Sequence, residues 1–559
     1  MAKQEAGISA MPHRVLKLDA KDNVLIALES FRKGDQVRMG ESQYDLVSDV
    51  PAKYKFATED LAPGDSVIMY GVLVGKAVAP IRRGEVITVR NLRHDASSFQ
   101  ENTGTFRWIP PDVSKWQEST FLGYHRADGQ VGTRNHWLVI PLVFCENRNI
   151  AMLKQAFEEE LGFAAPPIYR RQVAELARLY REGKSESSES HFLEAPKPAK
   201  HRSPLFENID GIQFLIHEGG CGGTREDSNN LCGLLAGYIH HPNVAGATIL
   251  SLGCQNSQTA ILREQLRARD PNFSKPLIVL EQQQTGSEFA MLSEAIRKTF
   301  DGLVEANRNR RAPAPLSQLC IGLKCGGSDG FSGISANPAI GHVADMVTAL
   351  GGRGILSEFP ELCGVEQGLI NRSASKAVGD RFIHLMRDYA ERARAVRSGF
   401  DMNPSPGNIR DGLITDAMKS AGAAKKGGTS PVTAVLDYPE YSTEPGLNLQ
   451  CTPGNDVECV TAQVGAGANV VLFTTGLGTP TGNPIAPVVK ISTNSELARR
   501  MHDIIDIDAG AVVSGEKTIE QMGETILEFA MRVASGEVHT KAEVLAQRDF
   551  IPWKRGVSL

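Results

Sequence analysis

Short apolar segments separated by polar turns make up the first hundred residues of the chain. The segments are residues 15–18, 24–28, 66–70, 72–74 and 85–89. Apolar runs of this length between turns rich in glycine and aspartate are typical of β-strands, and no good helix interrupts them. The pattern predicts a small, compact all-β domain over residues 12–97.

A different pattern begins after residue 208, where a short apolar strand, a glycine- or cysteine-rich loop and a helical segment follow one another repeatedly. The expected strands are residues 212–216, 248–252, 319–323, 354–357 and 470–473. A continuous apolar run at residues 137–144 predicts one more buried strand. We therefore expect an α/β multidomain protein with largely parallel sheets, in which ligands bind beyond the carboxyl ends of the strands.

Two polar stretches interrupt these patterns and set the expected domain boundaries. Residues 98–118 contain two adjacent prolines and no periodicity, which predicts a linker. Residues 183–204 are polar and contain prolines, which predicts an exposed insertion. We expect a second domain over residues 119–310 that carries this insertion, and a C-terminal α/β domain over residues 313–559.

The composition excludes several classes of protein. The chain has 559 residues, of which 41% are hydrophobic and 22% charged, and its net charge of −5 is unsuited to nucleic acid as the main partner. No run approaches the ~18 apolar residues of a membrane helix, and the first residues lack the apolar core of a signal peptide. The nine cysteines include no CxxC pair, as expected for free thiols in a reducing compartment. We expect a soluble cytoplasmic protein, with a homodimer as the default assembly.

The loop that follows the strand at residues 212–216 brings together several groups that can carry chemistry. Four glycines surround Cys221 and would let backbone amides approach a ligand closely. His217 is a candidate base or acid, Cys221 a candidate metal ligand, and Arg225 a candidate partner for a substrate carboxylate. A tight turn with a hydrogen-bonded histidine is the alternative.

Residues 325–338 form the most distinctive loop of the chain. Cys325 and Asp329 are candidate metal ligands, and Ser328 is a candidate substrate-binding residue. Asn337 precedes a proline at the start of an expected helix, where backbone donors suit a carboxylate. A purely structural turn is the alternative.

Carboxylates follow the strand at residues 354–357. They are Glu358, Glu361 and Glu366. Paired carboxylates suit acid–base chemistry or a hard metal ion, and Glu361 is our candidate catalytic residue among them. Exposed loop carboxylates without a function are the alternative.

A second glycine-rich loop follows the strand at residues 470–473. Residues 475–482 superficially resemble a phosphate-binding loop, but their spacing matches neither GxxxxGK[ST] nor GxGxxG, so a nucleotide is not expected. The favoured interpretation is a backbone nest for a carboxylate, with Gly476 and Thr479 as candidate binding residues. Lys490 lies just beyond and is a candidate for the same carboxylate.

Motifs in and around these loops occur in order along nearly the whole chain outside residues 183–204. They are residues 123–135, 241–243, 252–254, 325–338, 358–361, 403–408, 452–456, 475–480 and 505–510. Together they resemble the altronate/galactarate dehydratase family, and the N-terminal β domain resembles the SAF-type, β-clip-like domain of that family. Residues 282–284, 445–449 and 555–559 resemble the altronate branch more than the galactarate branch.

The resemblance implies a hydro-lyase that removes water from a small 2,3-dihydroxy sugar acid, with D-altronate favoured, to give a 2-keto-3-deoxy acid. It also implies Fe²⁺, or Mn²⁺ or another divalent ion, as cofactor. In such a reaction a divalent ion stabilises the enediolate, a base removes the C2 proton and an acid helps the C3 hydroxyl to leave. Our candidates for catalysis are His217, Glu361 and Asp19, and Asp19 is also a candidate metal ligand.

Three positions depart from the family pattern. Asp19 stands where the SAF domain of the family usually carries a histidine, Gln255 stands where many members have glutamate, and Leu477 stands where many have arginine. A carboxylate at position 19 can ligate a hard ion or act as a base, but it is a poor acid at neutral pH. The departures leave two alternatives open: a lyase for galactarate or another hydroxy acid, and a catalytically impaired sugar-acid-binding protein.

Overall fold

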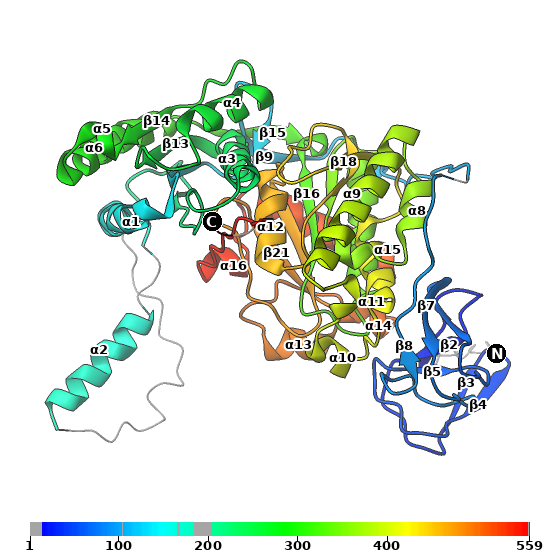
Figure 1. Cartoon of the computed structure of the whole chain (residues 1–559). Helices are drawn as coiled ribbons and strands as arrows, with labels where there is room; N and C mark the ends of the chain where they lie inside the picture. Colours follow the sequence, from blue (N-terminus) through cyan, green and yellow to red (C-terminus); the bar gives the residue numbers. More distant parts are fainter. Residues whose placement is uncertain (1–13, 103, 165–167, 184–203, 557, 559) are drawn as a thin grey trace, which may run out of the picture.

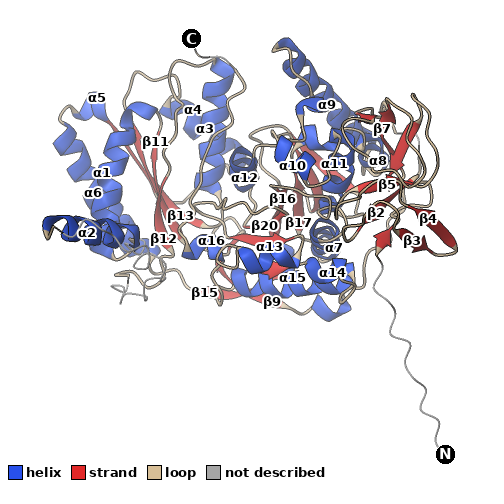
Figure 2. Ribbon diagram, turned by 90° about the horizontal axis from the view of Figure 1, so that it is seen from below, coloured by secondary structure: helices blue, strands red, loops and turns tan. Residues whose placement is uncertain are grey.

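The computed structural model describes residues 14–556 and 558, apart from residues 103, 165–167 and 184–203. The chain forms an N-terminal β domain and two α/β domains (Figure 1). A second view places the C-terminal domain between the other two (Figure 2). The predicted fold class, an all-β domain followed by α/β domains with largely parallel sheets, is confirmed. The insertion predicted at residues 183–204 lies outside the described residues except at its ends.

The N-terminal domain consists of short antiparallel strands in three small sheets, with the orders β1-β2-β5, β3-β4 and β6-β7-β8. The strands are β1 Val15–Leu16, β2 Val24–Ala27, β3 Gln36–Met39, β4 Ser42–Asp45, β5 Lys55–Ala57, β6 Ser66–Met69, β7 Val72–Ala77 and β8 Leu92–Arg93. The prediction of a strand at residues 85–89 is wrong, because this segment forms only an isolated bridge between Val86 and Phe56. The Asn91 side chain hydrogen-bonds to the backbone of this segment. It donates to Val86 O at 2.9 Å and accepts from Thr88 N at 2.8 Å.

The second domain is built on a four-stranded parallel sheet with the order β12-β11-β13-β14. Its strands are β11 His136–Pro141, β12 Gly211–Phe214, β13 Val244–Ser251 and β14 Leu277–Glu281. Its helices are α1 Asn147–Leu161, α2 Ile168–Arg181, α3 Arg225–His240, α4 Thr259–Arg269, α5 Gln282–Thr285 and α6 Glu288–Ala306. The apolar run at residues 137–144 corresponds to β11, whose residues are all buried. The ring of Trp137 packs so closely on Gly246 and Gly302 that a Cβ at either position would lie within 2.5 Å of it.

The C-terminal domain is built on a seven-stranded parallel sheet with the order β18-β19-β17-β16-β20-β21-β22. Its strands are β16 Cys320–Cys325, β17 Arg353–Leu356, β18 Val432–Leu436, β19 Gly446–Gln450, β20 Val470–Thr475, β21 Val488–Ser492 and β22 Ile507–Asp508. Its helices are α7 Ala336–Ala349, α8 Glu366–Asn371, α9 Lys376–Ala395, α10 Pro406–Arg410, α11 Asp416–Ala423, α12 Asp456–Gly465, α13 Ser495–Arg500, α14 Gly510–Val513, α15 Ile519–Ala534 and α16 Lys541–Val544. None of the helices in the described part of the chain has the length and apolar character needed to cross a bilayer.

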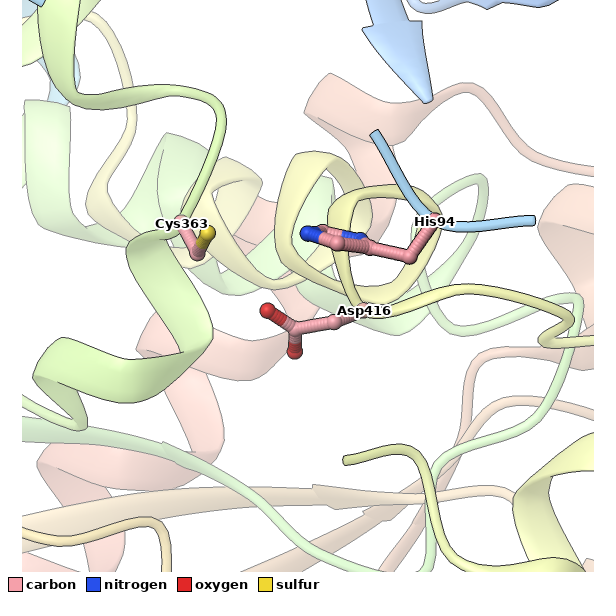
Figure 3. Close-up of side chains that lie close together, drawn as sticks. All are labelled: His94, Cys363 and Asp416. Carbon is pink, nitrogen blue, oxygen red and sulfur yellow. The ribbon is translucent and has the colours of Figure 1, made fainter. Parts of the chain in front are cut away.

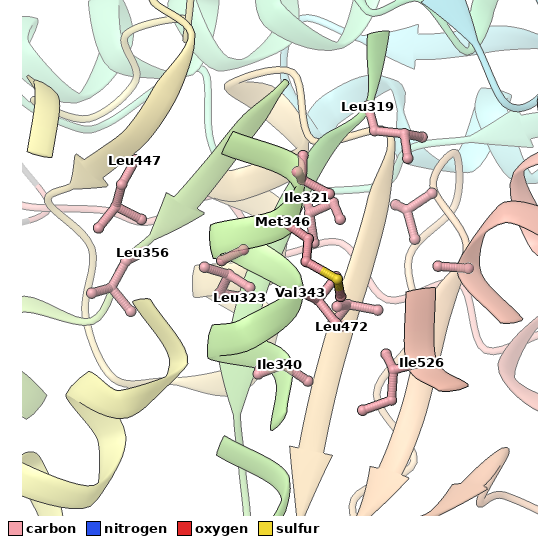
Figure 4. Close-up of a cluster of buried hydrophobic side chains, with 14 of the residues drawn as sticks. Leu319, Ile321, Leu323, Ile340, Val343, Met346, Leu356, Leu447, Leu472 and Ile526 are labelled. Carbon is pink, nitrogen blue, oxygen red and sulfur yellow. The ribbon is translucent and has the colours of Figure 1, made fainter. Parts of the chain in front are cut away.

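The core of the C-terminal domain holds its central strands in place. Ile321 and Leu323 on β16 and Leu472 on β20 lie in one cluster with Ile340 and Val343 on α7 (Figure 4). All five side chains are fully buried. Strands that are buried on both faces need apolar residues at successive positions, which is why the sequence shows continuous apolar runs here. The packing gives the carboxyl ends of these strands a fixed arrangement.

The segment predicted as a linker, residues 98–118, runs along the C-terminal domain. Trp108 Nε1 donates to Thr429 Oγ1 at 3.3 Å, and Lys115 Nζ lies 2.9 Å from a carboxylate oxygen of Glu524 on α15. The segment leads into an antiparallel sheet of order β10-β9-β15, whose strands are β9 Thr120–His125, β10 Val131–Gly132 and β15 Arg311–Pro315. This sheet also packs against α15, so it joins the second domain to the C-terminal domain.

Candidate active site

Four strand ends of the seven-stranded sheet meet at one pocket of about 930 Å³. Cys325 ends β16, Glu361 lies in the 3-10 helix η5 (Phe359–Leu362) after β17, Asp456 begins α12 after β19, and Thr481 follows β20. Because these strands are parallel, their carboxyl ends lie at the same edge of the sheet. The pocket therefore occupies the position at which α/β proteins bind ligands.

A group of buried charges lies beside this pocket. The two carboxylate oxygens of Glu358 accept hydrogen bonds from Lys324 and Lys426, and all three side chains are at most 1% exposed. Lys324 Nζ also lies 2.9 Å from Asp456 Oδ1, and Lys426 Nζ lies 2.9 Å from the Cys325 sulfur. Burial opposes the charge of Lys324, but Asp456 and Glu358 raise its pKa well above the usual value. Glu358 has a φ of 68°, and strained backbone of this kind clusters at functional sites.

Glu361, Lys419 and Asn403 form a second set of contacts on the pocket wall. Lys419 Nζ lies 2.8 Å from Glu361 Oε1 and 3.0 Å from Asn403 Oδ1, and Asn403 Nδ2 donates to the same glutamate oxygen at 3.3 Å. Burial would raise the pKa of Glu361, but the attraction of Lys419, Lys324 and Lys426 lowers it to about 2. The wall therefore presents an ionised carboxylate next to a protonated amine.

This arrangement suits a small hydroxylated anion. The ammonium groups of Lys324, Lys419 and Lys426 are matched by Glu358, Glu361 and the partly exposed Asp456, so a bound carboxylate shares an amine with one of these side chains. An ammonium group in a water-poor pocket attracts a carboxylate and stabilises negative charge that develops during a reaction. Asn403 and Asn408 line the same pocket and offer hydrogen bonds to hydroxyl groups.

Family models match nearly the whole chain in three consecutive parts. The altronate/galactarate dehydratase SAF domain matches residues 13–95, the second domain of D-galactarate dehydratase/altronate hydrolase matches residues 123–307, and the C-terminal domain of D-galactarate/altronate dehydratase matches residues 316–558. An altronate dehydratase from Bacillus subtilis (strain 168) is 33% identical over 546 residues, which are 97% of this chain and 99% of the relative. The chain belongs to the altronate/galactarate dehydratase family.

Two relatives from Escherichia coli (strain K12) extend the comparison. An altronate dehydratase is 34% identical over 520 residues, which are 92% of this chain and 94% of the relative. A galactarate dehydratase (L-threo-forming) is 29% identical over 530 residues, which are 94% of this chain and 93% of the relative. The predicted class of enzyme, a hydro-lyase that acts on sugar acids, is confirmed.

Two of the residues predicted for the site of this dehydratase, Cys325 and Glu361, line the pocket. Ser328 is 3% exposed and lies beside them, and its carbonyl oxygen accepts a hydrogen bond from Asn408 Nδ2 at 2.7 Å. The Asn408 side chain is thereby held at the pocket wall. The loop at residues 325–338 thus reaches the pocket through its first residues.

Asp329 and Asn337, from the same loop, make internal contacts instead. Asp329 is fully buried, pairs with Lys53 of the N-terminal domain at 3.1 Å and accepts from Thr493 Oγ1 at 2.9 Å. Asn337 donates to a backbone carbonyl at 3.0 Å and accepts from Thr474 Oγ1 at 2.6 Å. Since these contacts occupy both side chains, they hold the loop in place and do not face the pocket.

The predicted carboxylate nest around residues 475–482 shapes one edge of the site. Gly476 leaves no room for a side chain, because a Cβ there would lie 2.3 Å from Asp329 Cγ. Thr479 is half-buried in the same loop, and the buried Lys490 donates to the carbonyl oxygen of Thr481. Thr481 lines the pocket. Gly476, Thr479 and Lys490 are not among the described residues that line it.

His217 and Cys221 line a different pocket, of about 570 Å³, between the second domain and the C-terminal segment of the chain. His217 Nε2 lies 2.8 Å from Pro141 O, and His217 Nδ1 accepts from Gly219 N at 3.1 Å. Burial lowers the pKa of this imidazole to about 4. Both ring nitrogens are engaged in these contacts, as in the alternative of a tight turn with a hydrogen-bonded histidine, and the role in proton transfer stays a prediction. Arg225 is exposed at the start of α3.

The four residues predicted as metal ligands do not come together. Asp19 is exposed on the N-terminal domain, where its Oδ1 accepts from Lys21 N at 2.9 Å. Cys221 lies in the second domain, whereas Cys325 and Asp329 lie in the C-terminal domain. These residues therefore cannot share one ion in this arrangement.

The three lysines of the site were missed from the sequence. Lys324 is the penultimate residue of β16, and a lysine inside a continuous buried strand is unusual enough to have been a signal. Lys419 lies on α11, and Lys426 lies in the 3-10 helix η7 (Ala424–Gly427) that follows it. Both belong to a segment rich in small residues. Nothing in that segment indicates that both amines are buried.

The cluster around Cys325 has the spacing but not the charge for a metal ion. One ligand atom each of Cys325, Glu358 and Glu361 lies within 4.8 Å of the others. Three ammonium groups already pair with the two glutamates. A divalent cation would be repelled by these groups and would have to displace their ion pairs. These residues do not fit the divalent ion that the family implies.

Proposed function

We propose that this protein removes water from an aldonate, with D-altronate as the favoured substrate, to give a 2-keto-3-deoxy acid. The observation that carries the proposal is the pair of ionised Glu361 and protonated Lys419 on the wall of a polar pocket. The higher identity to altronate dehydratases than to a galactarate dehydratase supports the choice of altronate.

The two side chains supply the groups that the elimination requires. Lys419 binds the substrate carboxylate, and the anion shares the charge of the amine, which raises the pKa of Glu361 and strengthens it as a base. Glu361 accepts the C2 proton, and the electron pair of the C2–H bond is delocalised onto the substrate carboxylate as an enediolate. The pair then forms the C2–C3 double bond as the C3–O bond breaks, and the hydroxyl takes a proton from Lys419 and leaves as water. The resulting enol loses its hydroxyl proton and gains a proton at C3, which gives the 2-keto acid. Lys324 and Lys426 stabilise the enediolate charge through the field of the site.

We also propose a divalent ion as cofactor, because the family resemblance implies one. Fe²⁺ is the first choice and Mn²⁺ the alternative. When bound, such an ion polarises the oxygens of its ligand and stabilises negative charge. The elimination itself relies on Glu361 and the three lysines, because the cluster of Cys325, Glu358 and Glu361 does not fit the ion.

The test is an assay of 2-keto acid formation from a panel of aldonates and aldarates, with added Fe²⁺ and after chelation. We expect D-altronate to give the highest kcat/KM, and we expect Glu361→Gln and Lys419→Met each to lower it by about 100- to 1000-fold. Glu543→Gln is the matched control, because Glu543 is a partly buried glutamate that pairs with the buried Arg134 outside this pocket.

The assay distinguishes an altronate dehydratase from a lyase for another acid and from a binding protein without activity. Preference for an aldarate would assign the galactarate type of substrate in place of altronate. Tight binding of a sugar acid by folded protein without turnover would identify a catalytically impaired binding protein. Unchanged turnover in both pocket variants would exclude Glu361 and Lys419 as the reacting groups.

A further inference from the structure

Three side chains of different chemistry meet where the N-terminal domain contacts the C-terminal domain. His94 follows β8, Cys363 follows η5, and Asp416 is the first residue of α11. One ligand atom from each residue lies within 4.8 Å of the others. The three side chains converge on one point from three separate segments of the chain (Figure 3).

The Asp416 carboxylate has no partner at this point. The residue is 1% exposed, and both carboxylate oxygens are buried without a hydrogen bond from any described residue. A buried carboxylate without a counter-charge or donors is costly. Lys419, one turn further along the same helix, is already paired with Glu361. Lys419 therefore acts on Asp416 only through its electrostatic field, and no cation among the described residues pairs with this carboxylate.

Two further acidic residues lie close to these side chains. Glu366 and Asp401 lie close enough to Cys363 to interact with it electrostatically, and Glu366 is 3% exposed. The imidazole of His94 makes only a long contact to the helix, with Ala417 N at 3.4 Å from Nδ1. An ion bound at the other ring nitrogen would leave the ring proton on Nδ1 and give up this weak bond at small cost.

We propose that His94, Cys363 and Asp416 bind one divalent transition-metal ion. A nitrogen, a thiolate and a carboxylate oxygen together suit ions of intermediate softness such as Fe²⁺, Co²⁺ and Zn²⁺ better than Mg²⁺ or Ca²⁺. Ligands bound to one such ion stand about 3–4 Å apart, so small side-chain rotations close the site. Binding releases the thiol proton to solvent and leaves a coordination position for water.

The ion would connect the N-terminal domain to the elements that carry the catalytic pair. Cys363 comes two residues after Glu361, and Asp416 comes three residues before Lys419. None of the three ligands is among the described residues that line the active-site pocket. The ion therefore acts by positioning Glu361 and Lys419. This inference does not rest on the proposed substrate, because metal binding is measured without turnover.

Cobalt substitution in the full-length protein tests the site. The protein is freed of metal with a chelator and titrated with Co²⁺, and absorption and bound metal are measured. We expect one equivalent to bind with a thiolate-to-cobalt charge-transfer band in the near ultraviolet. Cys363→Ser removes this band, and His94→Gln and Asp416→Asn each weaken binding at least about 10-fold. Zn²⁺ raises the midpoint of thermal unfolding of the wild type and not that of Cys363→Ala.

Other cysteines provide the controls. Cys254→Ser, at an exposed thiol of the second domain, keeps the band. Loss of the band in Cys325→Ser with retention in Cys363→Ser would place the ion in the lysine–glutamate cluster and overturn the proposal. Binding without any thiolate band, or no stoichiometric binding by folded wild-type protein, overturns it as well.

Discussion

Replacing Glu361 with glutamine removes one charge from the site and nearly keeps the shape of the side chain. Glu361 is 3% exposed and lies 2.8 Å from Lys419. Burial raises the pKa of its carboxyl, but Lys419, Lys324 and Lys426 outweigh burial and lower the pKa from 4.5 to about 2. A shift of this size corresponds to about 3 kcal/mol of stabilisation of the folded state. We expect Glu361→Gln to lower the free energy of unfolding at neutral pH by about that amount.

The contribution of Glu361 to the free energy of unfolding depends on pH. Because the pKa of Glu361 is lower in the folded than in the unfolded state, its contribution is complete above the unfolded value of 4.5 and is lost as the pH falls toward about 2. The difference in unfolding free energy between wild type and Glu361→Gln should therefore be constant near neutral pH. It should shrink progressively below about pH 4.5.

Denaturant unfolding at a series of pH values measures this difference. The fluorescence of Trp553, which stacks on Tyr389 in the same domain, reports on the relevant core. Glu543→Gln is the matched control, because it weakens the pair, 2.7 Å apart, that the partly buried Glu543 forms with the buried Arg134, and it should lose stability without losing dehydration activity. A loss of stability in Glu361→Gln that stays the same down to about pH 3 would refute the electrostatic account.

Three further substitutions test other parts of the structure. Gly476→Ala places a Cβ 2.3 Å from Asp329 Cγ and should lower the free energy of unfolding by about 1–3 kcal/mol, as measured in thermal melts. Gly368→Ala is the control and should have little effect, because its Cβ meets no atom within 4 Å. Lys53→Met leaves the buried Asp329 without its cation and should destabilise by about 3 kcal/mol in denaturant unfolding; an unchanged midpoint would contradict this role. Burial lowers the pKa of Lys490 to about 8, so wild-type stability should rise between that pH and the unfolded value of 10.5, and Lys490→Met should abolish the rise in melts across this range.

The pattern of apolar residues was sufficient for the fold class. Apolar runs predicted six of the parallel strands, β11, β12, β13, β16, β17 and β20, because a strand covered on both faces needs apolar residues at successive positions; β14, β18, β19, β21 and β22 were not predicted. The false strand at residues 85–89 shows the limit of this reasoning. There the side chain of Asn91 satisfies backbone groups that a neighbouring strand would otherwise bind, and a single polar residue gives no warning of this.

The location of the pocket also followed from the sequence, since parallel strands bring their carboxyl ends, and hence Cys325 and Glu361, to one edge of the sheet. Tertiary structure alone decided the chemistry at that edge. Lys419 and Lys426 become reactive neighbours of Glu361 and Glu358 only because α11 and η7 pack against the strand ends, across more than fifty residues of chain. In the same way, only the fold places Pro141 and Gly219 beside the two ring nitrogens of His217. A sequence determines which residues must be buried, but the charge and reactivity of a buried group depend on which partners the fold places beside it.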